Sequence, residues 1–178
     1  MSWKISQQIR QPSKVEFLGF GDVITPRTME KMKEIINESI RDYYVRRWAE
    51  KIIERAGQTD SGKLDAIYNF IYNQTNYVRD PFGLELLKTP QVSLQLIEIG
   101  EIPGLDCDDL AILSLSLLKS IGYPVALRAA GFGPDDRYTH VYGLVRVPKV
   151  GWVPFDLVRG VGLGNEPPGI KRVWDVEV

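Results

Sequence analysis

Three residues of this chain have the types and the order needed for nucleophilic catalysis by a thiol. Cys107 is the single cysteine, His140 is the single histidine, and Asp156 ends the short segment that follows the histidine. A thiol, an imidazole and a carboxylate can act as nucleophile, general base and orienter of that base. The sequence therefore predicts a Cys107–His140–Asp156 triad, provided that the fold unites three separate segments.

Cys107 stands where a polar loop turns into an apolar helix. Asp106 is a good N-cap, and Asp109 follows it at the spacing of a capping box. In a first helical turn, unpaired N–H groups and the helix dipole lower the pKa of a cysteine. The carboxylates of Asp106, Asp108 and Asp109 act in the opposite direction, so a nearby imidazolium is needed to favour the thiolate. The alternative for a lone cysteine is a small buried apolar residue.

A hairpin can bring His140 and Asp156 together. If Val147-Pro-Lys149 forms a three-residue loop, His140 lies directly opposite Asp156, and the two side chains share one face of the sheet. We then expect the Nδ1–H of His140 to bind Asp156, which leaves Nε2 for the thiol. The alternatives are a structural imidazole and a carboxylate that stabilises a turn.

Helical periodicity precedes the cysteine. Thr25-Pro26 is typical of an N-cap followed by proline, and apolar residues recur at helical spacing as far as Gly57. An unbroken helix of this length would reach about 45 Å, so the pattern leaves a kink or two helices open. We expect an edge strand at 15–20, a helix at 63–74, a loop at 76–90, and either a helix or a strand at 92–99.

The helix that follows Cys107 should end near Gly122 and is apolar on nearly all sides, which predicts that it is buried. Strand-like segments follow at 124–130, 139–147 and 152–156, and a surface connection at 160–169. Helices followed by strands predict an α+β fold. We expect residues 1–57 to form an N-terminal arm and long helix packed on a core of residues 58–178, in one compact domain overall.

Composition excludes several classes of function. The net charge is −1, and acidic residues dilute the basic and aromatic cluster Arg41–Trp48, which disfavours nucleic acid. One cysteine and one histidine cannot form an internal disulfide or a four-ligand zinc site. The N-terminus lacks the apolar core of a signal peptide, and the run Leu110–Leu118 is too short to span a bilayer. These features predict a cytoplasmic protein that binds no membrane.

From about Ala66 to Val158 the chain resembles the transglutaminase-like superfamily, whose fold is related to papain. Cys107-Asp-Asp-Leu-Ala, which opens an apolar helix ending in Ser-Ile-Gly-Tyr-Pro, is similar to the nucleophile helix of that family. His140-Val-Tyr and Gly151-Trp-Val-Pro-Phe-Asp resemble its histidine and aspartate blocks. The upstream segments at 67–72 and 77–80 resemble members encoded by phages, which makes a virion-associated protein a further alternative.

The resemblance implies a papain-like α+β fold in which a buried nucleophile helix packs on an antiparallel sheet. It also implies that Cys107, His140 and Asp156 act through a thioester. Tyr77 or Gln91 could supply an additional oxyanion donor. We expect no cofactor. Acidic residues beside the cysteine bind calcium in some relatives, and Asp106 and Asp108 could do so here, although helix capping is the simpler role.

The function predicted on this basis is hydrolysis of an amide or peptide bond in a protein or peptide substrate. The alternatives are a transglutaminase that forms isopeptide bonds, and a structural or binding module, such as a virion component, that retains the fold without turnover. Hydrolysis and transamidation use the same side chains, so the sequence does not separate them. The sequence also leaves the oligomeric state open.

Overall fold

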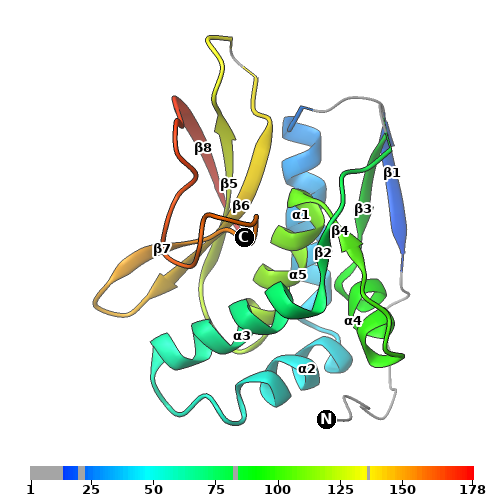
Figure 1. Ribbon diagram of the computed structural model, residues 1–178, viewed down its shortest axis with the longest axis vertical. Helices are drawn as coiled ribbons and strands as arrows, with labels where there is room; N and C mark the ends of the chain where they lie inside the picture. Colours follow the sequence, from blue (N-terminus) through cyan, green and yellow to red (C-terminus); the bar gives the residue numbers. More distant parts are fainter. Residues whose placement is uncertain (1–13, 20–22, 82–83, 136) are drawn as a thin grey trace.

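The computed structural model describes residues 14–19, 23–81, 84–135 and 137–178. A group of helices lies on one side and a four-stranded antiparallel sheet on the other, with α5 between them (Figure 1). This arrangement confirms the predicted α+β class. The first thirteen residues of the expected N-terminal arm lie outside the described residues.

Helix α5 (Cys107–Ser120) is the centre of the core. Its residues from Asp108 to Leu118 are all buried, as the apolar pattern predicts. The helix packs against β6 on one side and against α1, α2, α3 and α4 on others. Burial on every side stabilises the helix through packing and fixes the position of its first turn, which carries Cys107.

The periodic segment from Thr25 to Gly57 forms two helices, α1 (Pro26–Ser39) and α2 (Tyr43–Ile53). Thr25 caps α1 through the backbone N–H of Thr28, and Asp42 caps α2 through the N–H of Tyr44. Because the side chain of Asp42 accepts one of the N–H groups that a helix start leaves unpaired, a new helix can begin where the chain turns. Buried side chains of both helices join those of α5 in one apolar cluster.

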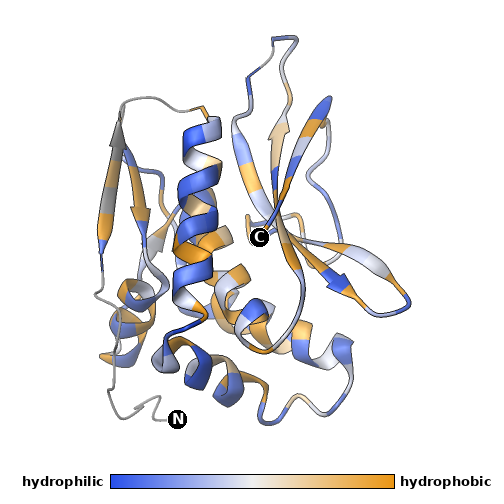
Figure 2. Ribbon diagram, turned by 180° about the vertical axis from the view of Figure 1, so that it is seen from behind, coloured by the Kyte–Doolittle hydropathy of each residue, from blue (hydrophilic) through white to orange (hydrophobic). Residues whose placement is uncertain are grey.

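Helix α3 (Asp60–Gln74) begins at its N-cap Thr59, and the undecided segment becomes α4 (Pro90–Glu98). Figure 2 shows α1 with mainly hydrophilic residues on its outward side and the apolar α5 behind it. Among the described residues, no helix combines the length and the apolar character that crossing a bilayer requires.

The predicted loop at 76–90 is wrong in two places. Strand β2 (Asn76–Tyr77) pairs in parallel with β4 (Gly104–Leu105), and β3 (Glu85–Lys88) pairs with β1 (Val15–Gly19). These strands are too short to carry a recognisable alternation, and their partners lie far away in sequence. The predicted edge strand near residue 15 is confirmed by β1.

The main sheet has the order β7-β6-β5-β8, with every neighbouring pair antiparallel. Its strands are β5 (Val125–Gly131), β6 (His140–Val147), β7 (Gly151–Phe155) and β8 (Arg172–Glu177). The first three agree with the predicted segments to within one residue at each end, whereas β8 was not predicted. The connection from β7 to β8 covers residues 156–171.

The hairpin between β6 and β7 has a different register from the one predicted. Val147 pairs with Gly151, so the loop is 148–150 and not 147–149, and Lys149 adopts a positive φ of 65°. Continued by one residue, this register sets Asp156 opposite Tyr142 and not opposite His140. The shift moves each partner by two positions, so His140 and Asp156 remain on the same face as diagonal neighbours.

Gly143 allows α5 and β6 to approach each other closely. A Cβ atom at this position would lie 2.6 Å from Cδ2 of Leu115. Residues of odd number in this part of β6 therefore face the helix, whereas those of even number, including His140 and Tyr142, face the other side of the sheet. The contact sets the distance between the helix that carries Cys107 and the strand that carries His140.

Candidate active site

Cys107 occupies the first position of α5, after the predicted N-cap. The side chain of Asp106 accepts the backbone N–H of Asp109 at 3.2 Å. The backbone N–H of Val141 donates a hydrogen bond to the Cys107 sulfur, which lowers the pKa of the thiol. Since Val141 directly follows His140, this contact brings the cysteine to the start of β6.

A cavity of about 420 Å³ opens over Cys107. Cys107 is partly exposed and lines this cavity, so a molecule bound there can reach the thiol. Four of the ten residues that line the cavity are acidic. The lining consists of Ile24, Tyr77, Arg79, Asp80, Leu84, Glu85, Asp106, Cys107, Asp108 and Thr139. The cavity therefore combines a thiol with an excess of carboxylates over cations. Of the expected triad, Cys107 lines it, whereas His140 and Asp156 do not.

The surroundings of Cys107 favour the neutral thiol. Burial raises the pKa of Cys107 well above its ordinary value, and the charges of Asp108 and Asp106 raise it further. The thiol donates to Oδ1 of Asp108 at 3.3 Å, an interaction that the thiolate cannot make. The opposition that the sequence predicts between helix start and acidic neighbours is thus decided in favour of the acids.

The acidic neighbours of Cys107 also raise one another's pKa values. Burial, the charge of Asp106 and a hydrogen bond with Glu85 raise the pKa of Asp108 well above its ordinary value. Burial and the charge of Asp106 raise the pKa of Asp109 to about 7, even though Lys88 opposes this effect. Several carboxyl groups in one buried turn cannot all ionise without cost.

Asp109 does not complete the predicted capping box. Its Oδ1 accepts the backbone N–H of Lys88 at 2.8 Å, and its Oδ2 pairs with the Lys88 ammonium. The side chain is drawn away from the N-cap because β3 offers both a peptide donor and a charge. Asp109 therefore ties the start of α5 to the β1-β3 pair.

His140 and Asp156 are in contact through the ring nitrogen that the sequence interpretation did not choose. Nε2 of His140 lies 2.7 Å from Oδ2 of Asp156, whereas Nδ1 was expected there. The altered register explains the difference, because it makes Asp156 a diagonal neighbour of His140, and the carboxylate then approaches the ring along the strand and not from directly opposite. A carboxylate can only accept, so Nε2 carries the hydrogen and Nδ1 is left as the basic nitrogen.

Asp156 is fixed in its position. It is only 1% exposed, and its Oδ1 accepts the backbone N–H of Val158 at 2.9 Å. Both oxygens thus have a described donor, one from the imidazole and one from the chain that follows β7. This carboxylate has the geometry of a group that holds the imidazole.

The two candidates for an oxyanion donor lie in different places. Tyr77 lines the cavity over Cys107 and interacts with the side chain of Arg79. Gln91 is 1% exposed, does not line this cavity, and donates through Nε2 to Asp42 at 2.8 Å. Gln91 therefore connects α4 to Asp42, the N-cap of α2. The sequence analysis did not identify Asp42 as an N-cap, so this role of Gln91 was not predicted.

Asp106 and Asp108 both lie at the cavity, with polar contacts inside the protein. Asp106 caps α5, and Asp108 contacts Cys107 and Glu85. Within the described ranges, no group of three or more histidine, cysteine or acidic side chains is arranged to hold a metal ion.

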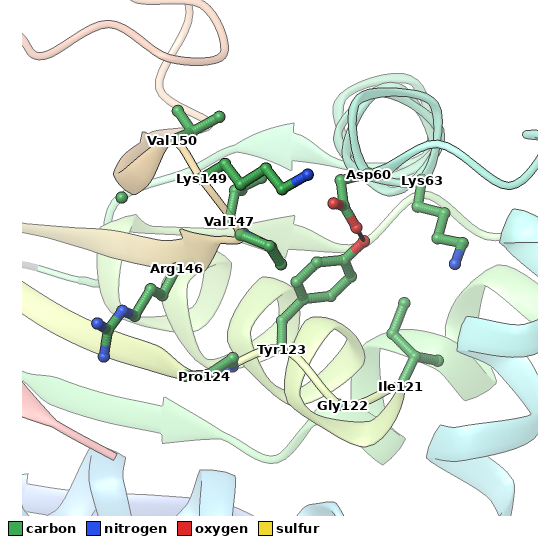
Figure 3. A pocket seen from close by; sticks show the side chains of 12 residues that line it. Asp60, Lys63, Ile121, Gly122, Tyr123, Pro124, Arg146, Val147, Lys149 and Val150 are labelled. Atoms are coloured by element: carbon green, nitrogen blue, oxygen red, sulfur yellow. Dashed lines mark hydrogen bonds between the residues drawn. The ribbon is translucent and has the colours of Figure 1, made fainter.

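A larger cavity, of about 670 Å³, lies at the opposite end of α5, where Tyr123 donates to Asp60 at 2.6 Å (Figure 3). Lys63, Lys149 and Arg146 also line it. The length of α5 separates it from Cys107 by about 20 Å. It contains no residue of the expected triad, so its size does not make it the reaction site.

Four polar residues of the cavity were given no role in the sequence analysis: Arg79, Asp80, Glu85 and Thr139. Arg79 and Asp80 belong to the segment 77–80, whose resemblance to the family was the only signal. Glu85 lies on β3, which was expected to be a loop. Thr139 directly precedes His140 and could have been inferred from that position.

Comparison with known proteins identifies the family of this chain. The family model described as the transglutaminase-like superfamily matches residues 46–157, which is more than half of the chain and includes Cys107, His140 and Asp156. A similar solved structure is that of a candidate cysteine protease from Cytophaga hutchinsonii, with 18% identity and a TM-score of 0.45. The match covers 76% of this chain and 48% of that protein, so the chain spans about half of its length. None of the curated proteins that were compared matches the chain.

Proposed function

We propose that this chain, which belongs to the transglutaminase-like superfamily, is a thiol-dependent acyl-transfer enzyme. Cys107 acts as the nucleophile, His140 as the general acid and base, and Asp156 as the group that orients the imidazole. The proposal is supported most by the hydrogen bond from the backbone N–H of Val141 to the Cys107 sulfur, one residue beyond a histidine whose ring is bound by a buried carboxylate. His140 projects from the sheet face away from α5 and does not line the cavity over Cys107, so the proposed proton transfer requires its ring to reach the thiol past the end of β6.

The proposed reaction has two halves. In the first, Nδ1 of His140 takes the thiol proton while Sγ attacks the carbonyl carbon of an amide. The C–N bond then breaks, the imidazolium returns the proton to the leaving amine, and a thioester remains. In the second, His140 takes a proton from water while the water oxygen attacks the thioester carbon; the C–S bond then breaks, the imidazolium returns the proton to the sulfur, and the carboxylic acid is released.

The high pKa of Cys107 indicates how the thiol is activated. In the resting protein the thiol keeps its proton and donates it to Asp108 in a hydrogen bond. Proton transfer to His140 should therefore accompany attack on the carbonyl, in contrast to a preformed ion pair. A substrate that displaces water from the cavity would strengthen this transfer, because electrostatic interactions grow in a drier site.

Oxyanion stabilisation can come from two groups at the cavity. The backbone N–H of Cys107 lies at the helix start, where it has no partner within the helix. Tyr77 is the proposed side-chain donor, since its hydroxyl belongs to the same cavity and contacts Arg79. Burial and the charge of Cys107 raise the pKa of Tyr77, so the phenol keeps the proton that it would donate.

We favour hydrolysis of a peptide or protein amide, because water is always available to resolve the thioester. Transamidation by an amine is the alternative within the same chemistry. A binding module that retains the fold is the alternative from another class. It is supported by the resting hydrogen bond of Cys107, which opposes formation of the nucleophile.

Alkylation of the single cysteine tests the proposal without a known substrate. Wild type and His140→Ala are treated with iodoacetamide from pH 5 to pH 10, and the modified fraction is measured by intact mass. We expect faster labelling of wild type near neutral pH and a smaller difference between the two proteins toward pH 10, where hydroxide ionises more of the thiol. Identical profiles for the two proteins would exclude proton transfer to His140.

An activated ester distinguishes the outcomes of the thioester. p-Nitrophenyl acetate should add one acetyl group to wild type and none to Cys107→Ala. Decay of this adduct is then followed with and without added ethylamine, and the product is identified as acetate or N-ethylacetamide. Acetate as the main product in the presence of amine supports hydrolysis, amide supports transamidation, and an undetectable adduct supports the binding module.

A further inference from the structure

The ring of His140 has close aromatic neighbours besides its carboxylate partner. Its centroid lies 5.5 Å from that of Tyr142, with the two ring planes inclined by 27° in a stacked arrangement. Phe132 lies 6.4 Å away at a larger angle. One hydrogen bond to Asp156 fixes Nε2 but still permits the ring to rotate about that bond. A flat neighbour against the ring face removes this freedom.

Tyr142 is well placed for this purpose. It follows His140 by two positions on β6, so both side chains project from the same face of the sheet. The residue is 2% exposed and does not line the cavity over Cys107. Its contact with the proposed catalytic groups is the stacking on His140, so we expect its effect on the reaction to pass through that ring.

The hydroxyl end of Tyr142 is also held. It donates to Oε1 of Glu166 at 3.2 Å, and Arg128 pairs with the same carboxylate. Burial and the charge of Glu166 raise the pKa of Tyr142, so the phenol remains a donor throughout the working range. Glu166 belongs to the connection between β7 and β8, which also supplies Asp156 at its start.

Arg128 is anchored in turn by β8. Its Nε and Nη2 bind the two oxygens of Asp175 at 2.7 and 2.6 Å. The strand register sets Arg128 opposite Tyr142 on β6 and opposite Asp175 on β8, so the three residues form one row across the sheet. Bidentate pairing fixes the guanidinium plane and its orientation toward Glu166.

We propose that Tyr142 is a positioning residue for His140, and that Glu166 and Arg128 fix Tyr142 in the orientation that holds the imidazole. This inference rests on the proposed function for the role of His140. Asp156 determines which ring nitrogen is hydrogen-bonded and which is left for the thiol proton, while Tyr142 determines the plane of the ring. Apolar neighbours complete the setting, since Tyr142 packs with Ala126, Ala130 and Leu144 on this face of the sheet.

The single histidine makes the test direct. In protein labelled with ¹⁵N-histidine, every imidazole signal belongs to His140, and the two nitrogen shifts report the tautomer whether or not the protein is active. We expect wild type to show one tautomer with the hydrogen on Nε2. Tyr142→Phe, which keeps the ring, should retain it, whereas Tyr142→Leu should show averaged nitrogen shifts.

Kinetics supply the second readout. Acetylation of Cys107 by p-nitrophenyl acetate should fall about 10- to 100-fold in Tyr142→Leu, because a small misplacement of a catalytic group has effects of this size. Tyr142→Phe should lose less than Tyr142→Leu, and Glu166→Gln should fall between wild type and Tyr142→Leu. Glu177→Gln, an exposed carboxylate on the same sheet, is the matched control and should behave as wild type.

The outcomes separate the two proposals. An unchanged tautomer and acetylation rate in Tyr142→Leu would overturn the positioning role. If that variant does not fold, Glu166→Gln decides the question, since equality with Glu177→Gln would overturn it as well. Failure of wild type to form the acetyl adduct would count against the proposed function, while the nitrogen shifts would still report on the ring.

Discussion

The candidate site has two regions, the surroundings of His140 (the histidine side) and those of Cys107 (the cysteine side), and they differ in how they affect the group at their centre. Around His140, a buried carboxylate and an aromatic ring hold the imidazole with Nδ1 available as a base. Around Cys107, burial and carboxylates keep the thiol protonated. Under the proposed roles, the base is thus held in place in the resting protein, whereas the nucleophile is still protonated. We therefore expect a substrate to be needed before the thiol loses its proton.

The largest expected effect comes from disrupting the histidine side. Asp156→Asn should reduce acetylation of Cys107 by about 1,000-fold or more, because an amide can donate to Nε2 and stabilise the wrong tautomer. The ¹⁵N shifts of His140 should move with the rate. Asp65→Asn, an exposed carboxylate on α3, is the control. A wild-type rate in Asp156→Asn would remove Asp156 from the mechanism.

Gly143→Ala tests the contact that joins the two sides. The added methyl group meets Leu115, so α5 must shift away from β6, and we expect a loss of about 1–3 kcal/mol in the free energy of unfolding. Urea denaturation measures this loss. The variant should also acetylate more slowly, since Cys107 moves with the helix. Unchanged stability would mean that the sheet and helix adjust freely.

Asp108→Asn should lower the pKa of Cys107 and so reduce the difference between the cysteine side and the histidine side. Removal of a charge that raises the pKa of Cys107 should move the alkylation profile to lower pH, with labelling near pH 7 about tenfold faster. Asp135→Asn, at an exposed carboxylate paired with Arg137, provides the control. Slower labelling in Asp108→Asn would indicate that the carboxylate acts as a base for the thiol.

The carboxylates should also influence stability. Because the pKa of Asp109 is raised to about 7, the folded protein holds a proton between roughly pH 4 and pH 7 that the unfolded chain has lost. Stability should therefore fall as the pH rises through this window, by up to about 1.4 kcal/mol per pH unit for one such proton. Asp109→Asn should reduce this slope in urea denaturation measured at pH 5 and pH 6. An equal or steeper slope would contradict the assignment.

Much of the cysteine side could be predicted because its signals are local. Asp106 as N-cap, the burial of α5 and the opposing effect of the acids all follow from residues within one turn or one helix. The loop of the hairpin could not be placed correctly, because it requires a positive φ at Lys149, and this conformation is uncommon for a residue with a side chain. Face assignment for His140 and Asp156 was retained only because the register changed by an even number of residues.

The remaining features depend on partners distant in sequence. Lys88 draws Asp109 away from the N-cap, and Gln91 serves the cap of α2. Glu166 lies in a connection rich in glycine and proline, where no periodicity indicates which side chain turns back toward the sheet. Pairing of β8 with β5 decides that outcome, and β8 itself alternates between partly buried and exposed residues.

The position of β8 has a consequence for the order in which activity arises during synthesis. Cys107, His140, Asp156 and Tyr142 all leave the ribosome before Asp175. Until β8 pairs with β5, Arg128 lacks its bidentate partner and Glu166 is not fixed above Tyr142. Under the proposed roles, a nascent chain would already contain every reacting atom and yet remain a poor catalyst. Activity would then begin only after β8 pairs with β5 and completes the sheet.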